Sequence, residues 1–193
     1  MIYLLIFHNW SLKSNFLDGP ILRLLNLNFV FWNFDLYLYT KQYRMSFDKE
    51  KALKMVNDFC RNTLMDTLEI VYTDAGEGFL EATMPVNPRV HQPMGLLHGG
   101  ATVALAESVG SAASLLFVNP EVTEVRGIEI SANHLRSKRD GIVTGTARII
   151  HKGRSLHLWE IKVTDEQGRL ISLCKLTNMV MPRKRPAADS TEQ

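Results

Sequence analysis

The chain has 193 residues, of which 46% are apolar and 22% are charged. A chain of this length can bury a core without disulfides or metal ions, and its composition excludes a disordered, collagen-like or low-complexity protein. Basic residues exceed acidic residues by only two, and that excess lies within residues 1–44. The rest of the chain is neutral and lacks the basic surface that nucleic-acid binding requires, so we expect no nucleic-acid partner.

Cysteine usage points to a reducing compartment. Cys60 and Cys174 are the chain's two cysteines, and neither belongs to a CxxC motif or a Cys/His cluster. A disulfide framework or a metal site is therefore not expected. We expect a cytoplasmic protein.

Residues 1–44 differ in composition from the rest, since they hold 11 of the chain's 17 aromatic residues. They have no basic region or cleavage site typical of a secretory signal, and no uncharged apolar run of roughly 18 residues that could span a membrane. Two interpretations remain open. The segment is an N-terminal extension that packs on the body or a membrane surface, or it lies upstream of a natural start at Met45, which we favour.

The predicted elements begin with a helix that Ser46 or Asp48 caps and that runs through Cys60, presenting Phe59 among its apolar residues. Two strands, 68–72 and 78–84, form a hairpin. A proline-bounded loop, 85–95, leads to a helix over 101–117, which is apolar nearly all round and therefore buried on most sides. Four further strands, joined by short connections that predict antiparallel hairpins, follow at 124–135, 142–151, 155–164 and 169–181.

Together these elements predict an α+β domain over residues 45–182. In it, an antiparallel sheet of about six strands wraps around a long central helix. Residues 183–193 are expected to be a disordered tail.

Glu107 is the only charged residue between positions 101 and 117. A buried carboxylate is costly, so such a residue favours a base or nucleophile. The alternative is that Glu107 faces solvent or an interface between subunits. Ser111 lies one helical turn further on the same face, where it can bind the carboxylate or a water molecule, although an ordinary helix serine fits the pattern as well.

His98, Gly99 and Gly100 stand where the long helix begins. Free N–H groups at a helix start can polarise a carbonyl oxygen, although two glycines can also serve only a tight turn. Gly99 and Glu107 are eight residues apart, about 12 Å along a helix. They are too far apart to act on one carbonyl, so if they cooperate, they come from two chains of a dimer.

The run from Gln92 to Ser108, together with Gly127 to His134, resembles the hotdog-fold acyl-CoA thioesterases. It is most similar to the branch with a catalytic glutamate, which contains 1,4-dihydroxy-2-naphthoyl-CoA, 4-hydroxybenzoyl-CoA and aryl-carrier-protein proofreading thioesterases. The resemblance implies a hotdog fold and a homotetramer built as a dimer of dimers with shared active sites. No cofactor is implied, because coenzyme A is part of the substrate.

The resemblance also implies roles for individual residues. Glu107 matches the nucleophile or general base, and Gly99 matches the residue whose N–H polarises the thioester carbonyl, with Gly100 beside it. Ser111 matches a residue that holds the hydrolytic water. The remaining matches are polar groups at the acyl or thioester site and at the coenzyme A site, namely Gln92, His98, His134, Arg136 and Ser137. The alternative for His134 is that it is a histidine of the core. The alternative for Arg136 and Ser137 is that they lie at a solvated strand end.

The implied function is hydrolysis of an aromatic or medium-chain acyl-CoA to the free acid and coenzyme A, in menaquinone synthesis or a related aromatic pathway. A non-catalytic acyl-CoA binding or sensing protein is the alternative from another class.

Overall fold

The computed structural model describes residues 47–183. The expectations for residues 1–44 and for the C-terminal tail from residue 184 therefore lie outside the described residues. The elements in chain order are α3 (Lys49–Asp58), α4 (Leu64–Thr67), β1 (Val71–Gly76), β2 (Phe79–Val86), η1 (Pro88–Val90), β3 (His91–Gln92), β4 (Leu96–Leu97), α5 (Gly99–Leu115), β5 (Thr123–His134), β6 (Gly141–Lys152), β7 (Leu156–Asp165) and β8 (Leu170–Pro182).

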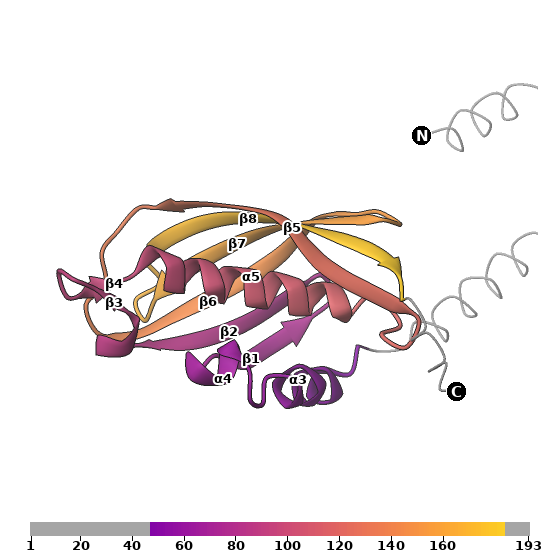
Figure 1. Ribbon diagram of the computed structural model, residues 1–193, viewed down its shortest axis with the longest axis horizontal. Coiled ribbons are helices and arrows are strands. Elements are labelled where there is room, and N and C mark those ends of the chain that lie inside the picture. Colours follow the sequence, from indigo (N-terminus) through magenta and orange to yellow (C-terminus); the bar gives the residue numbers. More distant parts are fainter. Residues whose placement is uncertain (1–46, 184–193) are drawn as a thin grey trace, which may run out of the picture. The chain divides into compact units, whose positions relative to one another are not determined.

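Six antiparallel strands form one sheet in the order β1-β2-β6-β7-β8-β5, and β3 pairs with β4 in a separate hairpin. The sheet curves around α5, and α3 and α4 lie beside the β1 edge (Figure 1). The predicted α+β architecture, with about six strands wrapped around a long helix, is confirmed. The predicted hairpin of the first two strands is also confirmed, because β1 pairs with β2.

The expected hairpin between strands 124–135 and 142–151 is wrong. β5 pairs with β8 at the opposite edge of the sheet, with Ile130 opposite Leu176, whereas β6 pairs with β2 and β7. Residues 135–140 therefore cross the end of the sheet; we call them the crossover segment. A local turn signal such as Asp140-Gly141 shows where a strand begins but does not determine its partner.

The first described helix begins where its cap predicts, because the Asp48 side chain accepts a hydrogen bond from the Lys51 N–H at 3.0 Å. Phe59, which was expected on its buried face, is instead 57% exposed. The strand predicted at 68–72 begins later, at Val71, because the short helix α4 precedes it and Glu69 adopts a positive φ of 55°.

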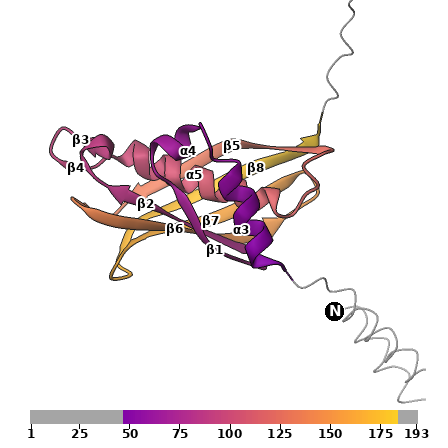
Figure 2. The same cartoon turned by 90° about the horizontal axis from the view of Figure 1, so that it is seen from below.

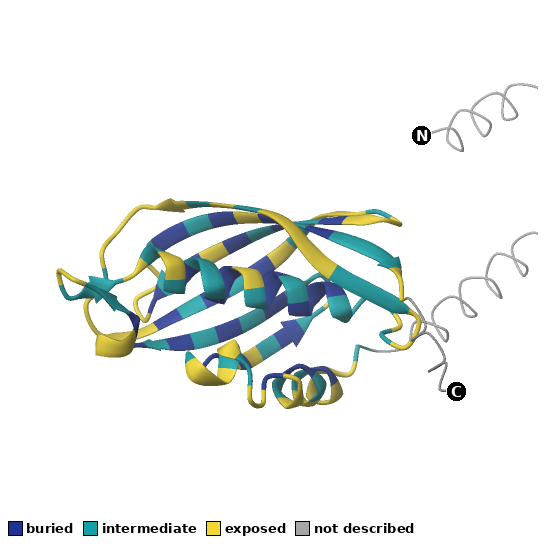
Figure 3. Cartoon of the chain, in the orientation of Figure 1, coloured by how far each residue is buried: buried dark blue, intermediate teal, exposed yellow. Residues whose placement is uncertain are grey.

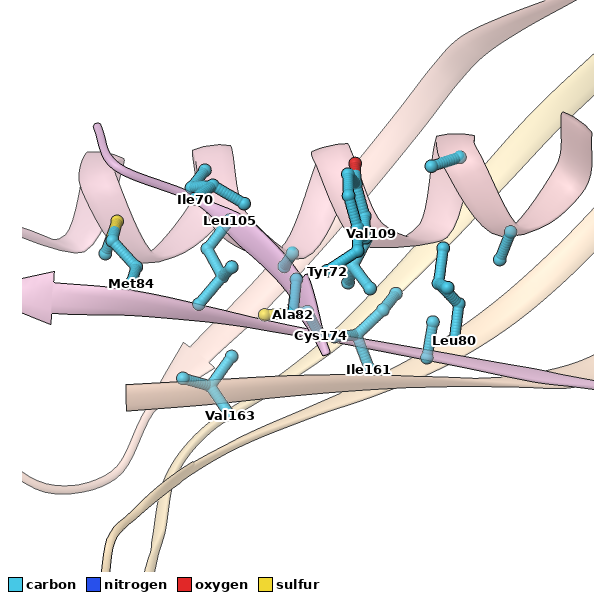
Figure 4. Packing of buried hydrophobic residues seen from close by; sticks show 14 of the residues in the cluster. Ile70, Tyr72, Leu80, Ala82, Met84, Leu105, Val109, Ile161, Val163 and Cys174 are labelled. Atoms are coloured by element: carbon cyan, nitrogen blue, oxygen red, sulfur yellow. The ribbon is translucent and has the colours of Figure 1, made fainter. Parts of the chain in front are cut away.

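The core fills the space between α5 and the concave face of the sheet. Leu105 and Val109 of α5 meet apolar side chains from β2, β7 and β8, as Figure 4 shows. Figure 2, turned by 90°, shows α3 and α4 on the same side of the sheet as α5.

One stripe of α5 is not buried in the core. Glu107 on this stripe is exposed, and Ala104, Ser108 and Ser111 are half-buried (Figure 3). The expectation that the helix is buried on most sides is confirmed, because Gly100 and Glu107 are the exposed residues of α5 and the others are buried or half-buried. The chemistry that the sequence assigns to α5 lies on its open side.

Candidate active site

A cavity of about 420 Å³ lies between the open stripe of α5 and the α3–α4 segment. We call it the Glu107 cavity, because Glu107 and Ser111 stand on its α5 side. The other walls are largely apolar and include Val56, Phe59, Leu64, Met65 and Leu115. This cavity can therefore hold an apolar group next to a carboxylate.

Two polar groups in the wall of this cavity are already bonded within the protein. The Tyr72 hydroxyl donates to the Ser108 carbonyl oxygen at 3.0 Å, and the Cys60 thiol donates to the Val56 carbonyl oxygen at 3.3 Å. Burial is the main cause that raises the pKa of both Tyr72 and Cys60, so both stay neutral near pH 7. The wall opposite Glu107 therefore presents no charge.

The Glu107 carboxylate lies against strand β5. A β-carbon placed on Gly127 would stand 2.9 Å from Glu107 Oε1, closer than such contacts allow. The lack of a side chain at Gly127 is what gives the carboxylate room there. Glu107 is exposed in the single protomer, so no group within residues 47–183 covers it completely.

Ser111 shares the face of α5 with Glu107, and both line the same cavity, as the helical spacing predicts. The Ser111 hydroxyl lies 3.4 Å from Asn178 Oδ1 and donates to it. Ser111 is therefore tied to strand β8.

A second cavity, of about 380 Å³, lies where the β3–β4 hairpin, the start of α5 and the crossover segment meet. We call it the His134 cavity. It brings together five of the residues that the sequence singles out, and these are Gln92, Gly99, His134, Arg136 and Ser137.

Gly99 and His134 are in close contact in this cavity. A β-carbon on Gly99 would stand 2.8 Å from His134 Nε2, so only glycine permits this approach. Because Gly99 is the first residue of α5, its N–H has no acceptor within the helix and is available to a ligand oxygen. His134 is exposed rather than buried in the core.

Gln92 is oriented by its own loop. Its Oε1 accepts a hydrogen bond from the Met94 N–H at 2.6 Å, which leaves the amide nitrogen as the donor toward the cavity. A donor at this position can bind a carbonyl or hydroxyl oxygen of a ligand.

His98 and Gly100 have a different local role in the structure. His98 caps α5, because its Nδ1 accepts the Gly100 N–H at 2.8 Å. Neither residue is among those that line the two cavities of the described chain. The Gly100 N–H is thus engaged, whereas the Gly99 N–H has no acceptor within residues 47–183.

The crossover segment, which carries Arg136 and Ser137, is held by an ion pair. Lys138 Nζ lies 2.5 Å from Glu166 Oε2, and Glu166 Oε1 accepts the Ile142 N–H at 2.6 Å. The bond from Lys138 is the main cause that lowers the pKa of Glu166 to about 2. Glu166 is therefore ionised at neutral pH and links the β7–β8 turn to the segment with the exposed Arg136 and Ser137.

The two cavities divide the predicted site. Glu107 and Ser111 lie in one, and Gln92, Gly99 and His134 lie in the other. One holds a carboxylate and the other holds N–H donors for a carbonyl oxygen, which together are the groups that attack on a thioester needs.

Two residues near Glu107 were missed as site residues by sequence reasoning. Gly127 belongs to a strand in which a glycine weakens pairing, and such a glycine often marks a close approach. Asn178 is a polar residue at an inward-facing position of β8, on the same face as Cys174 and Leu176. Both signals could have been found in the sequence.

Residues 47–183 contain no group of three or more His, Cys, Asp or Glu side chains arranged to hold a metal ion. In the same range, no helix is long and apolar enough to cross a membrane.

Comparison with known proteins identifies the class. Residues 94–172 match the model of the thioesterase superfamily. A 1,4-dihydroxy-2-naphthoyl-CoA hydrolase from Escherichia coli is 42% identical over 137 residues, which cover 71% of this chain and all of that protein. A proofreading thioesterase from Klebsiella pneumoniae is 44% identical over the same length, covering 71% of this chain and 99% of the relative.

Solved structures of thioesterases are also similar to this chain. A thioesterase from Pseudomonas aeruginosa, crystallised with a glutamine replaced by alanine, superposes with a TM-score of 0.67 at 42% identity and covers 72% of this chain and 98% of that one. Two structures of a Staphylococcus aureus thioesterase superpose with a TM-score of 0.61 at 38% identity, covering 62% of this chain and 99% or 98% of that one. One carries a Glu→Ala and the other a Gln→Ala substitution, fifteen positions apart.

The fold is therefore the hotdog fold, and the protein is a thioester hydrolase. The chain belongs to the thioesterase superfamily. The hydrolysis of acyl-CoA thioesters, expected from the sequence, is confirmed at the level of the family.

Proposed function

We propose that the protein hydrolyses aromatic or medium-chain acyl-CoA thioesters at active sites shared between two copies of the chain. The observation that carries this proposal is the division of the site between two cavities, with the acid in one and the carbonyl-binding groups in the other. In a dimer, the Glu107 cavity of one protomer can face the His134 cavity of its partner. Such a dimer brings the acid and the carbonyl-binding groups together.

The free edge of the sheet supports such a dimer. Among the described strands, β5 lies at an edge of the sheet and pairs only with β8, and Ile128 on it is 50% exposed. An unpaired edge of twelve residues is a template for pairing with a second copy. Because Gly127 of this edge contacts Glu107, pairing there brings the partner close to the carboxylate.

In the proposed mechanism the Gly99 N–H binds the thioester carbonyl oxygen, and Gln92 and His134 bind around it. Glu107 of the partner attacks the carbonyl carbon directly or activates a water molecule that Ser111 holds. The negative charge that develops on the carbonyl oxygen is stabilised by the N–H donor and by the positive end of α5. His98 and Gly100 shape this helix start through the cap that they form.

Substitutions in a relative support the two principal roles. The glutamine and the glutamate replaced in the Staphylococcus aureus thioesterase are fifteen positions apart, and the same spacing separates Gln92 from Glu107. This agreement favours Gln92 and Glu107 as partners in the reaction.

The Glu107 cavity favours an apolar acyl group. Its walls are largely apolar, and Tyr72 and Cys60 already donate their hydrogens to backbone carbonyls. The relatives named above act on aromatic thioesters or proofread, so an aromatic ring or a medium-length chain is the acyl group that we propose, and menaquinone synthesis is one pathway that supplies such a thioester.

The coenzyme A moiety would bind at the exposed Arg136 and Ser137, which provide a cation and a hydroxyl for its phosphates. We further propose that the reaction requires no cofactor or metal. The functional unit would be a dimer of dimers in the cytoplasm.

The test is release of free thiol from benzoyl-CoA, hydroxynaphthoyl-CoA and octanoyl-CoA by the full chain and by Glu107→Gln. Loss of a nucleophile or base lowers kcat by a factor of about 10³. The control is Glu50→Gln, which removes the same charge from an exposed position of α3 outside the Glu107 cavity and should keep full activity. If wild type and Glu107→Gln are equally inactive yet bind acyl-CoA, a binding or sensing role replaces the catalytic one.

A further inference from the structure

Asn178 is a fully buried polar residue close to the Glu107 cavity. It lies on β8 with 0% exposure, among inward-facing neighbours that include Leu176 and Cys174. A polar side chain in such surroundings is costly unless its hydrogen bonds are made. The hydrogen bonds of the Asn178 side chain therefore indicate its role.

The hydrogen bonds of the Asn178 side chain fix its orientation. The amide nitrogen donates to the Gly110 carbonyl oxygen at 3.0 Å and to Ser114 Oγ at 2.8 Å. A carbonyl oxygen can only accept, so the amide cannot be flipped. Trp159 Nε1 also donates to Ser114 Oγ, at 2.8 Å, and completes a network inside the core.

The other end of the amide points toward the catalytic carboxylate. Asn178 Oδ1 lies 3.4 Å from the Ser111 hydroxyl. It also lies 3.7 Å from the point where a β-carbon on Gly127 would stand, and Glu107 Oε1 lies 2.9 Å from that same point. The amide oxygen, the serine and the carboxylate therefore gather around one position on β5.

We propose that Asn178 is a positioning residue for the hydrolytic water. By accepting the Ser111 hydrogen, Asn178 Oδ1 turns the lone pairs of Ser111 toward the Glu107 cavity. The water then donates one hydrogen to Ser111 and the other to Glu107, which directs its oxygen at the carbonyl carbon. The new C–O bond forms, the proton on Glu107 passes to the leaving thiolate, and the C–S bond breaks. This inference rests on the roles proposed above for Glu107 and Ser111.

The test is a double-mutant cycle on kcat with benzoyl-CoA. Ser111→Ala and Asn178→Ala should each lower kcat by about tenfold with little change in KM, since both disturb the same water. The double variant should be no slower than Ser111→Ala alone, because Asn178 acts only through Ser111. Effects that multiply in the double variant would overturn the inference.

A control separates positioning from stability. Trp159→Phe removes a donor from the same buried network without touching Asn178 Oδ1, so it should lower Tm and leave kcat unchanged. If kcat falls with Tm across all these variants, Asn178 is only structural. Should Asn178→Ala not fold, Asn178→Thr supplies the same test, because threonine suits a strand but cannot reach Ser111.

The outcome also separates this inference from the proposed function. If Glu107→Gln keeps full activity, the proposed catalytic role fails. If Glu107→Gln is inactive while Asn178→Ala retains wild-type kcat, only the role of Asn178 is refuted.

Discussion

The two cavities beside α5 differ in how they are built. The Glu107 cavity is made of side chains, mostly apolar ones from α3, α4 and α5 around one carboxylate. The His134 cavity is shaped by the backbone, because it depends on a helix start, a glycine and the crossover segment. In the proposed function, the first cavity holds the acyl group, which differs between substrates, and the second holds the carbonyl and coenzyme A groups that all substrates share.

The comparison predicts that the backbone-built cavity tolerates change least. Gly99→Ala puts a β-carbon 2.8 Å from His134 Nε2, so the ring or the helix start must shift. Displacing a carbonyl donor should lower kcat by about 100-fold. Ala101→Gly, which loosens the same helix turn without adding atoms, should retain activity in the thiol-release assay. An unchanged kcat for Gly99→Ala would show that the Gly99 N–H does not bind the thioester carbonyl oxygen.

A second prediction concerns the support of the carboxylate. Gly127→Ala places a methyl group 2.9 Å from Glu107 Oε1 and must push the carboxylate away from β5. We expect kcat to fall by about tenfold, because the reaction rate falls steeply when a catalytic group is displaced from its position. Ile150→Ala, at a similarly exposed position of β6, serves as the control. Equal rates for the two variants would show that the position of Glu107 against β5 does not matter.

The side-chain cavity should instead respond with altered selectivity. Leu64→Ala enlarges the Glu107 cavity, and the side chain is 58% exposed in the protomer, so the fold should persist. We expect the ratio of kcat/KM for octanoyl-CoA to that for benzoyl-CoA to change several-fold, because the three carbon atoms lost from the wall change how well each acyl group fits. A parallel loss for both substrates would contradict the assignment of this cavity to the acyl group.

The smallest effect is expected at the ion pair of the crossover segment. Glu166→Gln frees Lys138 and loosens the segment that carries Arg136 and Ser137, so KM should rise a few-fold while kcat is retained. Coenzyme A should show the same weakening as a product inhibitor. An unchanged KM would separate the crossover segment from substrate binding.

The same variant gives a pH prediction. The folded-state pKa of Glu166 is lowered to about 2, below its value of about 4.3 in an unfolded chain. Its contribution to stability is therefore present above pH 4.3 and is lost as the pH falls toward 2. The difference in unfolding free energy between wild type and Glu166→Gln should thus be smaller at pH 3 than at pH 7, as measured by urea unfolding.

Strand positions were predictable from the sequence because alternation and turn residues are local signals. The four strands predicted from residue 124 onward agree with β5 to β8 within one residue at each end. The pairing of β5 with β8 was not predictable in this way, since the partner of a strand depends on contacts across the whole sheet.

The site was predictable where single residues stood out from their surroundings. Glu107 in an apolar helix and the glycines at the helix start point to the two halves of the proposed site. Asn178 and Gly127 were missed because their importance depends on which atoms of α5 they approach in the fold. A polar residue on the inward face of a strand marks an unusual position in the sequence, but its role follows only from its partners in the fold.

The central claim is that each active site combines groups from two chains, and complementation tests it most directly. Chains with Glu107→Ala and chains with Gly99→Ala are co-expressed with different affinity tags, and the doubly tagged dimer is isolated. In a shared-site dimer one site carries both substitutions and the other carries neither, so about half of the wild-type activity should return. A doubly tagged dimer as inactive as its two parents would show that Gly99 and Glu107 of one chain act together and would contradict the account.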